Sequence, residues 1–101
     1  MPDDLHPSDG VRLLLERKSV ESDDAAASYL GSVFTPNERF DYEIKLDLAG
    51  TASLVAKGRA APDALETKLA NIAKSTARAA KRKLGEQLPP WPARILRWRK
   101  A

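Results

Sequence analysis

The chain has 101 residues, of which 43% are apolar and 31% charged, and this balance is typical of a single globular domain. It contains no cysteine and one histidine, which excludes disulfides, thiol nucleophiles and zinc sites built on cysteine. No apolar run approaches the roughly 20 residues of a membrane-spanning helix, and the first residues are acidic where a signal peptide is basic, so we expect a cytoplasmic protein.

The net charge of +3 conceals a separation of charge along the chain. Residues 1–56 carry 5 basic and 11 acidic side chains, a balance of −6, whereas residues 57–101 carry 12 basic and 3 acidic ones, a balance of +9. A basic half of this kind indicates an anionic partner, either nucleic acid or a membrane surface. The alternative is that the two halves mainly attract each other within the fold.

The N-terminal half begins with a segment that has few apolar side chains to bury. Residues 1–10 are rich in proline and aspartate and cannot offset the entropy of ordering, so we expect a flexible acidic arm. Apolar side chains at every second position then predict a half-buried strand over 11–18. Residues 26–34 are rich in strand-favouring types and precede a turn, which favours a strand, although Ser22 and Gly31 also fit the two ends of a helix.

Residues 39–60 predict a hairpin. Apolar and charged side chains alternate strictly up to Leu48, as in a strand with one wet face, and a second strand follows Gly50. A three-residue loop, 49–51, sets apolar residues opposite apolar ones on one face and acidic residues opposite basic ones on the other. The predicted pairs are Leu48 with Ala52, Leu46 with Leu54, Ile44 with Ala56, Tyr42 with Gly58 and Phe40 with Ala60, and, on the outer face, Glu43 with Lys57 and Asp41 with Arg59.

A long helix is predicted over residues 64–84. Asp63 fits its N-cap with Glu66 as the reciprocal partner, and Gly85 fits a left-handed residue at its end. One face of this helix is apolar and rich in alanine, so we expect it to pack closely on the sheet. The residues of this face are Leu65, Leu69, Ile72, Ala73, Thr76, Ala77, Ala80 and Leu84.

The predicted fold is therefore α+β, an antiparallel meander of three or four strands with one long C-terminal helix across one face. The domain spans residues 11–88, and 89–101 form a tail rich in proline, tryptophan and arginine. Trp91, held between two prolines, is predicted to fold back and close one end of the core; the alternative is that it stacks on a ligand. The arginines after Pro92 recur too densely for a buried strand, and proline there suits the start of a short amphipathic helix.

The sequence offers little for catalysis. His6 is the only imidazole, and the arm that carries it would hold no geometry for proton transfer. There is no glycine-rich phosphate loop and no metal-ligand pattern. We therefore expect a protein that is not an enzyme, with no cofactor, no metal and no small-molecule substrate.

Two clusters of cations are the candidate binding residues. Lys74, Arg78 and Lys81 follow one another at helical spacing opposite the apolar face, with Arg82 beside them, so that they can contact successive phosphates. In the tail, Trp98 lies among Arg94, Arg97 and Arg99, a combination that can stack on bases and pair with phosphates. The alternative for the helix is that basic residues near its end complement the macrodipole on a solvated face.

Residues 40–84 resemble the last hairpin and final helix of the ribosome hibernation-promoting factor family. The similar features are the long alternating hairpin, the aspartate at the helix start (Asp63) and the lysines along the helix (Lys74, Lys81 and Lys83). The resemblance implies a βαβββα fold that binds the small ribosomal subunit through basic helical residues. In this chain residues 19–26 leave no room for the first helix of that fold, and the tryptophan-bearing tail is not part of its pattern.

Taken together, the residues predict a small accessory protein that binds structured RNA or the ribosome through its basic helix and cationic tail. The first alternative is a protein-interaction adaptor or a homodimer that docks through the tail or a sheet edge. The second alternative, association with a membrane surface through residues 91–100, is less favoured.

Overall fold

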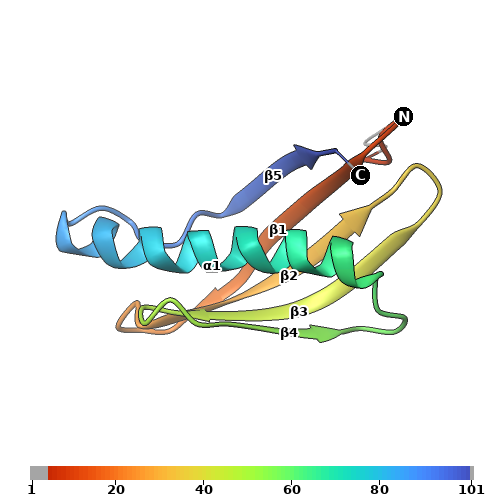
Figure 1. The fold of residues 1–101 in the computed structure, drawn as a ribbon. Coiled ribbons are helices and arrows are strands. Elements are labelled where there is room, and N and C mark those ends of the chain that lie inside the picture. Colours follow the sequence, from red (N-terminus) through yellow and green to blue (C-terminus); the bar gives the residue numbers. More distant parts are fainter. Residues whose placement is uncertain (1–4, 101) are drawn as a thin grey trace.

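The structure, a computed structural model, describes residues 5–100 and consists of one antiparallel sheet with one long helix across one of its faces (Figure 1). The predicted α+β class, meander and helix are confirmed, and the ambiguous segment 26–34 is a strand. The strands lie in the order β4-β3-β2-β1-β5. In chain order the elements are β1 (Val11–Val20), β2 (Ala26–Phe34), β3 (Arg39–Asp47), β4 (Ala52–Ala56), α1 (Asp63–Gly85) and β5 (Arg94–Arg99).

The sheet has five strands because residues 94–99, predicted to lie in a tail outside the domain, form β5 instead. β5 pairs antiparallel with β1, with Arg97 opposite Leu13 and Ile95 opposite Leu15. The density of arginines excludes a strand buried on both faces, but β5 lies at the edge of the sheet, where charged side chains are common. The predicted amphipathic helix after Pro92 is therefore wrong.

The β3–β4 hairpin is paired two residues away from the predicted register. Its three-residue loop is 48–50, so that Gly50 takes the last loop position with a φ of +88°. The carboxylate of Asp47 accepts hydrogen bonds from the backbone of Ala49 and Thr51 at 3.0 and 3.1 Å. A shift of two residues keeps every side chain on its predicted face. The observed pairs are Leu46 with Ala52, Lys45 with Ser53, Ile44 with Leu54, Glu43 with Val55 and Tyr42 with Ala56.

Both predicted caps of α1 are wrong, although its span is close to the prediction. Pro62 occupies the N-cap position, Asp63 is the first helical residue, and no side chain caps the helix start. Proline fits there because its fixed φ suits entry into a helix and it has no N–H to satisfy. Gly85 is the last helical residue, and the left-handed conformation falls on Gln87, with a φ of +61°.

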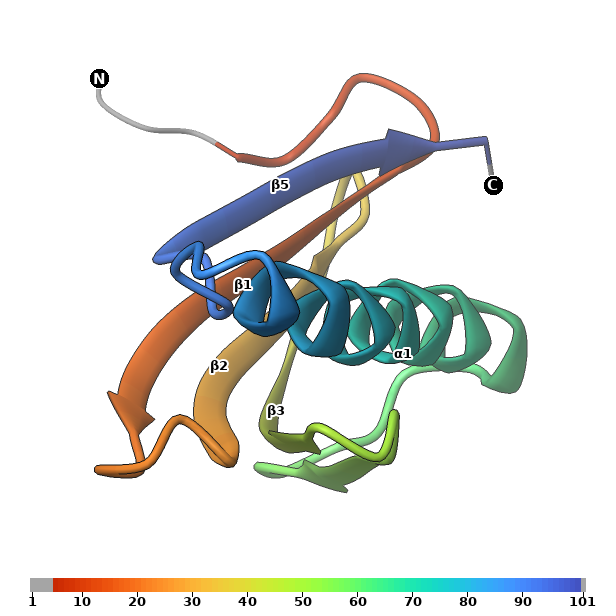
Figure 2. The same cartoon turned by 90° about the vertical axis from the view of Figure 1, so that its left-hand side faces the viewer.

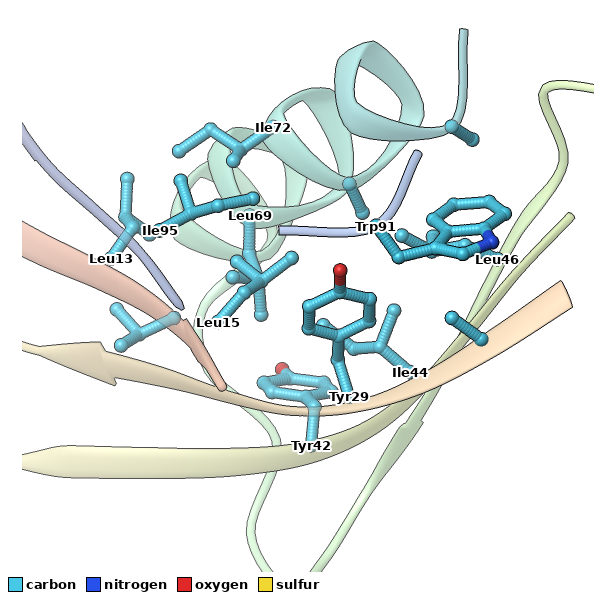
Figure 3. Packing of buried hydrophobic residues seen from close by; sticks show 14 of the residues in the cluster. Leu13, Leu15, Tyr29, Tyr42, Ile44, Leu46, Leu69, Ile72, Trp91 and Ile95 are labelled. Carbon is cyan, nitrogen blue, oxygen red and sulfur yellow. The ribbon is translucent and has the colours of Figure 1, made fainter. Parts of the chain in front are cut away.

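The core lies between α1 and the sheet and is built mainly from buried side chains of α1, β1, β2, β3 and β5, with partly buried side chains of β4 packed against it (Figure 3). The predicted helix face is buried, except that Leu65 and Leu84 at its ends are half-buried. Gly31 of β2 leaves room for the side chain of Ile44 on the neighbouring strand β3, because a Cβ at that position would collide with Ile44, whereas its distance of 3.4 Å from Leu69 of α1 would be an ordinary contact.

Trp91 closes one end of the core, as predicted, and is 2% exposed. Its indole N–H donates to the carbonyl of Asp24 at 2.9 Å, and its own carbonyl accepts from the Arg17 guanidinium at 2.7 Å. The Tyr29 hydroxyl donates to the carbonyl of Pro92 at 2.7 Å, and burial raises the pKa of Tyr29 to about 12 although Arg17 opposes this shift. The connection from α1 to β5 is thus fixed to the end of β1 and β2.

The segment before β1 packs against the sheet face that α1 leaves open. Pro7 is buried, the His6 ring meets Phe34 edge-on, and His6 Nδ1 donates to the carbonyl of Thr35 at 2.7 Å. The expectation of an arm without fixed geometry is therefore wrong for residues 5–10, because Phe34 and its neighbours provide an apolar surface on this second face. Residues 1–4 of the predicted arm lie outside the described residues.

Candidate nucleic-acid interface

The outer side of α1 carries a row of exposed cations. Lys74, Arg78 and Lys81 project from successive turns, and Arg82 lies beside them; we call these four residues the α1 ridge. Neighbours along the ridge are about one turn, or roughly 5 Å, apart. Within the part of the chain that the structure describes, none of the four forms an ion pair with a carboxylate. The predicted row of unpaired charge is therefore present on the helix.

The alternation of β5 divides the predicted tail residues between the two faces of the sheet. Arg97 and Arg99 lie on the side of α1, where they line a groove with helical residues. Leu96 and Trp98 lie on the open face. Arg94, at the start of the strand, has its Nε 4.0 Å from the Glu16 carboxylate.

A groove lies between α1 and β5 and is lined by residues of both elements. Figure 2 shows β5 above α1. The groove has two adjoining chambers of about 330 and 250 Å³, which share Ser75, Thr76, Ile95 and Arg97. We call the two chambers together the α1–β5 groove. The first chamber is completed by Lys68, Asn71, Ile72 and Arg99, and the second by Ala79, Lys83, Pro92 and Arg94.

The charge of this groove has one sign. Its lining includes five cations and, among residues 5–100, no aspartate or glutamate. Arg94 is the one cation of the five that lies within 4.0 Å of a carboxylate of the described residues. The Arg97 guanidinium donates to the carbonyl of Leu96, and that of Arg99 to the carbonyl of Trp98, each at 2.9 Å. Because a backbone carbonyl is neutral, these bonds orient the two guanidinium groups and leave their charge uncompensated.

The open face of the sheet is different, since several of its charges form ion pairs with each other. The Glu43 carboxylate lies 3.0 Å from Lys18 and 3.5 Å from Lys57, and the Lys18 hydrogen bond, with Lys57, lowers the pKa of Glu43. Glu43 and Lys57 are not directly opposite each other, as the predicted register had them, since Glu43 lies opposite Val55, but the two side chains still form an ion pair; the predicted pair of Asp41 with Arg59 is wrong. The shifted register places Arg59 beside Glu38.

Asp41 instead forms a small network with two neighbours on the same face. It accepts a hydrogen bond of 2.8 Å from Arg39 and one of 2.7 Å from the buried Ser32. Burial alone would raise the pKa of Asp41, but the hydrogen bonds from Arg39 and Ser32 outweigh it and lower the pKa below its ordinary value. Carboxylates of the acidic half therefore form ion pairs on the open face, and none of those in residues 5–100 lines the groove.

Trp98 does not join the cations with which the sequence groups it. Its side chain is 46% exposed on the open face, and its indole N–H donates to the carbonyl of Asp9 at 3.0 Å. Gly10 lies directly against the ring, since a Cβ there would lie 2.6 Å from it. The indole thus serves to hold the segment before β1.

The predicted binding residues therefore fall into three places. The structure places Arg97 and Arg99 beside α1, leaves the ridge on the outer side of the helix, and places Trp98 on the opposite face of the sheet, the face on which Arg94 approaches Glu16. Sequence reasoning missed Lys68 and Ser75. Their helical spacing places them on one flank of α1, but this flank can be recognised as part of a groove only when the position of β5 is known.

Comparison with known proteins adds no relative. No protein-family model matches the chain, and neither the curated proteins nor the solved structures contain a match. No helix among the described residues has both the length and the apolar character needed to cross a bilayer. Residues 5–100 also bring no three histidine, aspartate or glutamate side chains together as a metal site.

Proposed function

We propose that this chain is a cytoplasmic, non-enzymatic accessory protein that binds structured RNA, on the ribosome or free, through the α1 ridge and the α1–β5 groove. The observation that carries the proposal is the groove, where four cations without an ion-pair partner among residues 5–100 gather and no carboxylate of the described chain joins the lining; they are Lys68, Lys83, Arg97 and Arg99. The alternative that the basic and acidic halves only neutralise each other accounts for the open face but not for this groove. Unpaired cations at fixed positions are what a phosphate backbone requires.

The expected mechanism is release of counterions from RNA. Each phosphate that a lysine or arginine neutralises lowers the slope of log affinity against log salt by about 0.7 for a single strand and about 0.9 for a duplex. Contacts made by both the ridge and the groove therefore predict binding that weakens steeply with salt. The ridge spacing of about one helical turn suits contact with successive phosphates.

The test is fluorescence anisotropy with a labelled RNA hairpin that carries a single-stranded extension, titrated between about 50 and 200 mM salt. Two variants each remove two charges from the proposed interface: Lys74→Gln with Lys81→Gln on the ridge, and Arg97→Gln with Arg99→Gln in the groove. Lys45→Gln with Lys57→Gln removes two charges from the far side of the sheet and is the matched control.

We expect the affinity of the unchanged protein to fall at least about tenfold over this salt range. Each interface variant should flatten the salt slope by about 1.4 to 1.8, the share of two phosphate contacts, while the control keeps the slope and the affinity of the unchanged protein. Binding that ignores salt, or a control that loses as much affinity as the interface variants, would overturn the proposal.

A protein-interaction module is the second candidate, and β5 favours it. This strand is the edge of the sheet beyond β1, and it exposes Leu96 and Trp98 to 37% and 46% on the open face. Self-association would appear as a concentration-dependent mass in sedimentation equilibrium, and Leu96→Asp should abolish it. A monomer at all concentrations would leave RNA binding as the function to pursue.

A further inference from the structure

We infer that the α1–β5 groove holds an unpaired strand of the RNA by its phosphates, whereas the α1 ridge serves the paired regions. This inference rests on the function proposed above and specifies what the groove takes. It is drawn from the size of the groove, from the way its arginines are held and from the chemistry of its floor.

The size of the groove limits what can enter. The chamber of 330 Å³ lies at the lower end of the range for small-ligand pockets and the chamber of 250 Å³ lies just below it, so neither holds more than a group of about nucleotide size. A duplex has two strands joined by stacked pairs and cannot enter such a space. The ridge, by contrast, is exposed on the outer side of the helix, with Arg78 beside Gly50 of the β3–β4 loop, so that a broad surface can reach it.

The length of the groove suits a short stretch of strand. Lys68 and Lys83 mark its two ends on α1, and the helical rise over that distance is about 22 Å. The two chambers adjoin through Arg97, so that a strand can pass from one to the other without leaving the groove. We assign the groove about four nucleotides, the lower end of the range for small single-strand-binding domains.

The arginines of the groove are held in place before any ligand arrives. β5 is an edge strand, and the carbonyls of Leu96 and Trp98 accept hydrogen bonds from the guanidinium groups of Arg97 and Arg99. Each guanidinium has five N–H donors, so one bond to a carbonyl leaves a forked pair for a phosphate. The same bonds occupy two carbonyls that a partner strand would need, which favours a phosphate strand over a peptide at this edge.

The floor of the groove predicts weak discrimination among bases. Ile72 and Ile95 provide an apolar surface, and no aromatic side chain lines either chamber in the described chain, so bases have no ring to stack on. Asn71 and Ser75 lie one turn apart in the first chamber and can hydrogen-bond to ribose hydroxyls. The phosphates and sugars, rather than the base edges, are therefore the groups that the groove contacts.

The experiment compares an oligouridylate of about 12 nucleotides with a blunt RNA duplex of equal length, by anisotropy at about 150 mM salt. The groove variant is Arg97→Gln with Arg99→Gln, and the ridge variant is Lys74→Gln with Lys81→Gln. Because all four side chains are exposed, thermal melting should confirm that both variants stay folded. Arg97→Lys with Arg99→Lys keeps the charge and removes the guanidinium fork.

We expect the groove variant to bind oligouridylate about tenfold more weakly, the loss of two phosphate contacts at this salt, and to bind the duplex nearly as before. The ridge variant should show the reverse, and the lysine variant should recover only part of the loss. If the duplex binds but the groove variant weakens both RNAs equally, the inference is wrong and the proposed function stands. If neither RNA binds the unchanged protein, both are wrong.

Discussion

Trp91 and Trp98 lie seven residues apart in the chain and on opposite faces of the sheet. Trp91 is 2% exposed on the face that α1 covers, and its indole N–H reaches a carbonyl at the end of the core. Trp98 is 46% exposed on the open face, where its indole N–H holds the segment before β1. Trp91 therefore closes one end of the core, whereas Trp98 holds a surface segment by a hydrogen bond.

The difference between the two tryptophans extends to the two faces as a whole. The covered face is held by apolar side chains from five strands and the helix, whereas the open face relies on hydrogen bonds and ion pairs such as those of Glu43 and Asp41. Because these carboxylates form their ion pairs on the open face, they do not neutralise the cations beside α1. The proposed binding thus uses cations that the ion pairs of the open face do not involve, while Ile72 and Ile95 belong both to the core and to the groove.

Removal of β5 should destabilise the protein more than any other change considered, because this strand contributes side chains to both faces of the sheet. Deleting residues 93–101 removes the buried Ile95 and uncovers Leu13 and Leu15 of β1. We expect the melting temperature to fall by at least about 10 °C, since one large buried side chain alone is worth about 2 to 5 kcal/mol. Deleting only residues 100 and 101 is the control. A shortened chain that melts like the full one would show that β5 contributes nothing.

Matched substitutions of the two tryptophans measure the difference between the faces directly. Trp91→Ala should cost about 3 to 5 kcal/mol of unfolding free energy, because it leaves a cavity at the end of the core. Trp98→Ala should cost only about 1 kcal/mol, the value of a partly exposed contact and one hydrogen bond. Urea denaturation followed by circular dichroism measures both values. If both substitutions lowered the unfolding free energy equally, Trp91 and Trp98 would not differ as a core residue and a surface residue should.

The residues of the covered face could be predicted from the sequence because the spacing of apolar residues alone defines that face. Alternation along β3 and the three-to-four spacing along α1 each select one apolar face, and a register error of two residues in the hairpin changed neither. The caps of α1 were mispredicted because several residues near each end could fill the role. Local preference does not decide among them when the neighbouring chain, such as Pro62, already sets the backbone.

The candidate site could be predicted only in part, because it depends on which elements become neighbours. The cations of α1 and of residues 94–99 were recognisable as charge runs, yet nothing local indicates that β5 pairs with β1 and so lies beside the helix. That pairing turns Arg97 and Arg99 towards Lys68 and turns Trp98 away from all three. The groove is thus a product of topology, whereas the ridge is a product of helical spacing.

The smallest expected effect lies on the open face and depends on pH. The hydrogen bonds from Arg39 and Ser32 lower the pKa of Asp41 below its ordinary value of 3.8, against the effect of burial. A carboxylate with a lowered pKa in the folded state adds stability above its unfolded pKa, and this contribution is lost as the pH falls through the folded pKa. Asp41→Asn should therefore cost up to about 1 kcal/mol at neutral pH, a modest value because the side chain is 34% exposed.

Urea denaturation of Asp41→Asn and the unchanged protein at neutral pH and below about pH 3 separates this contribution from simple packing. The difference between the two proteins should shrink in acid, where Asp41 of the unchanged protein becomes protonated and loses its attraction to Arg39. Ser32→Ala removes one of the two donors and should reduce the pH-dependent part without abolishing it. If the cost of Asp41→Asn is the same in acid as at neutral pH, the carboxylate acts through its shape alone, and the open face is not held by charge at this position.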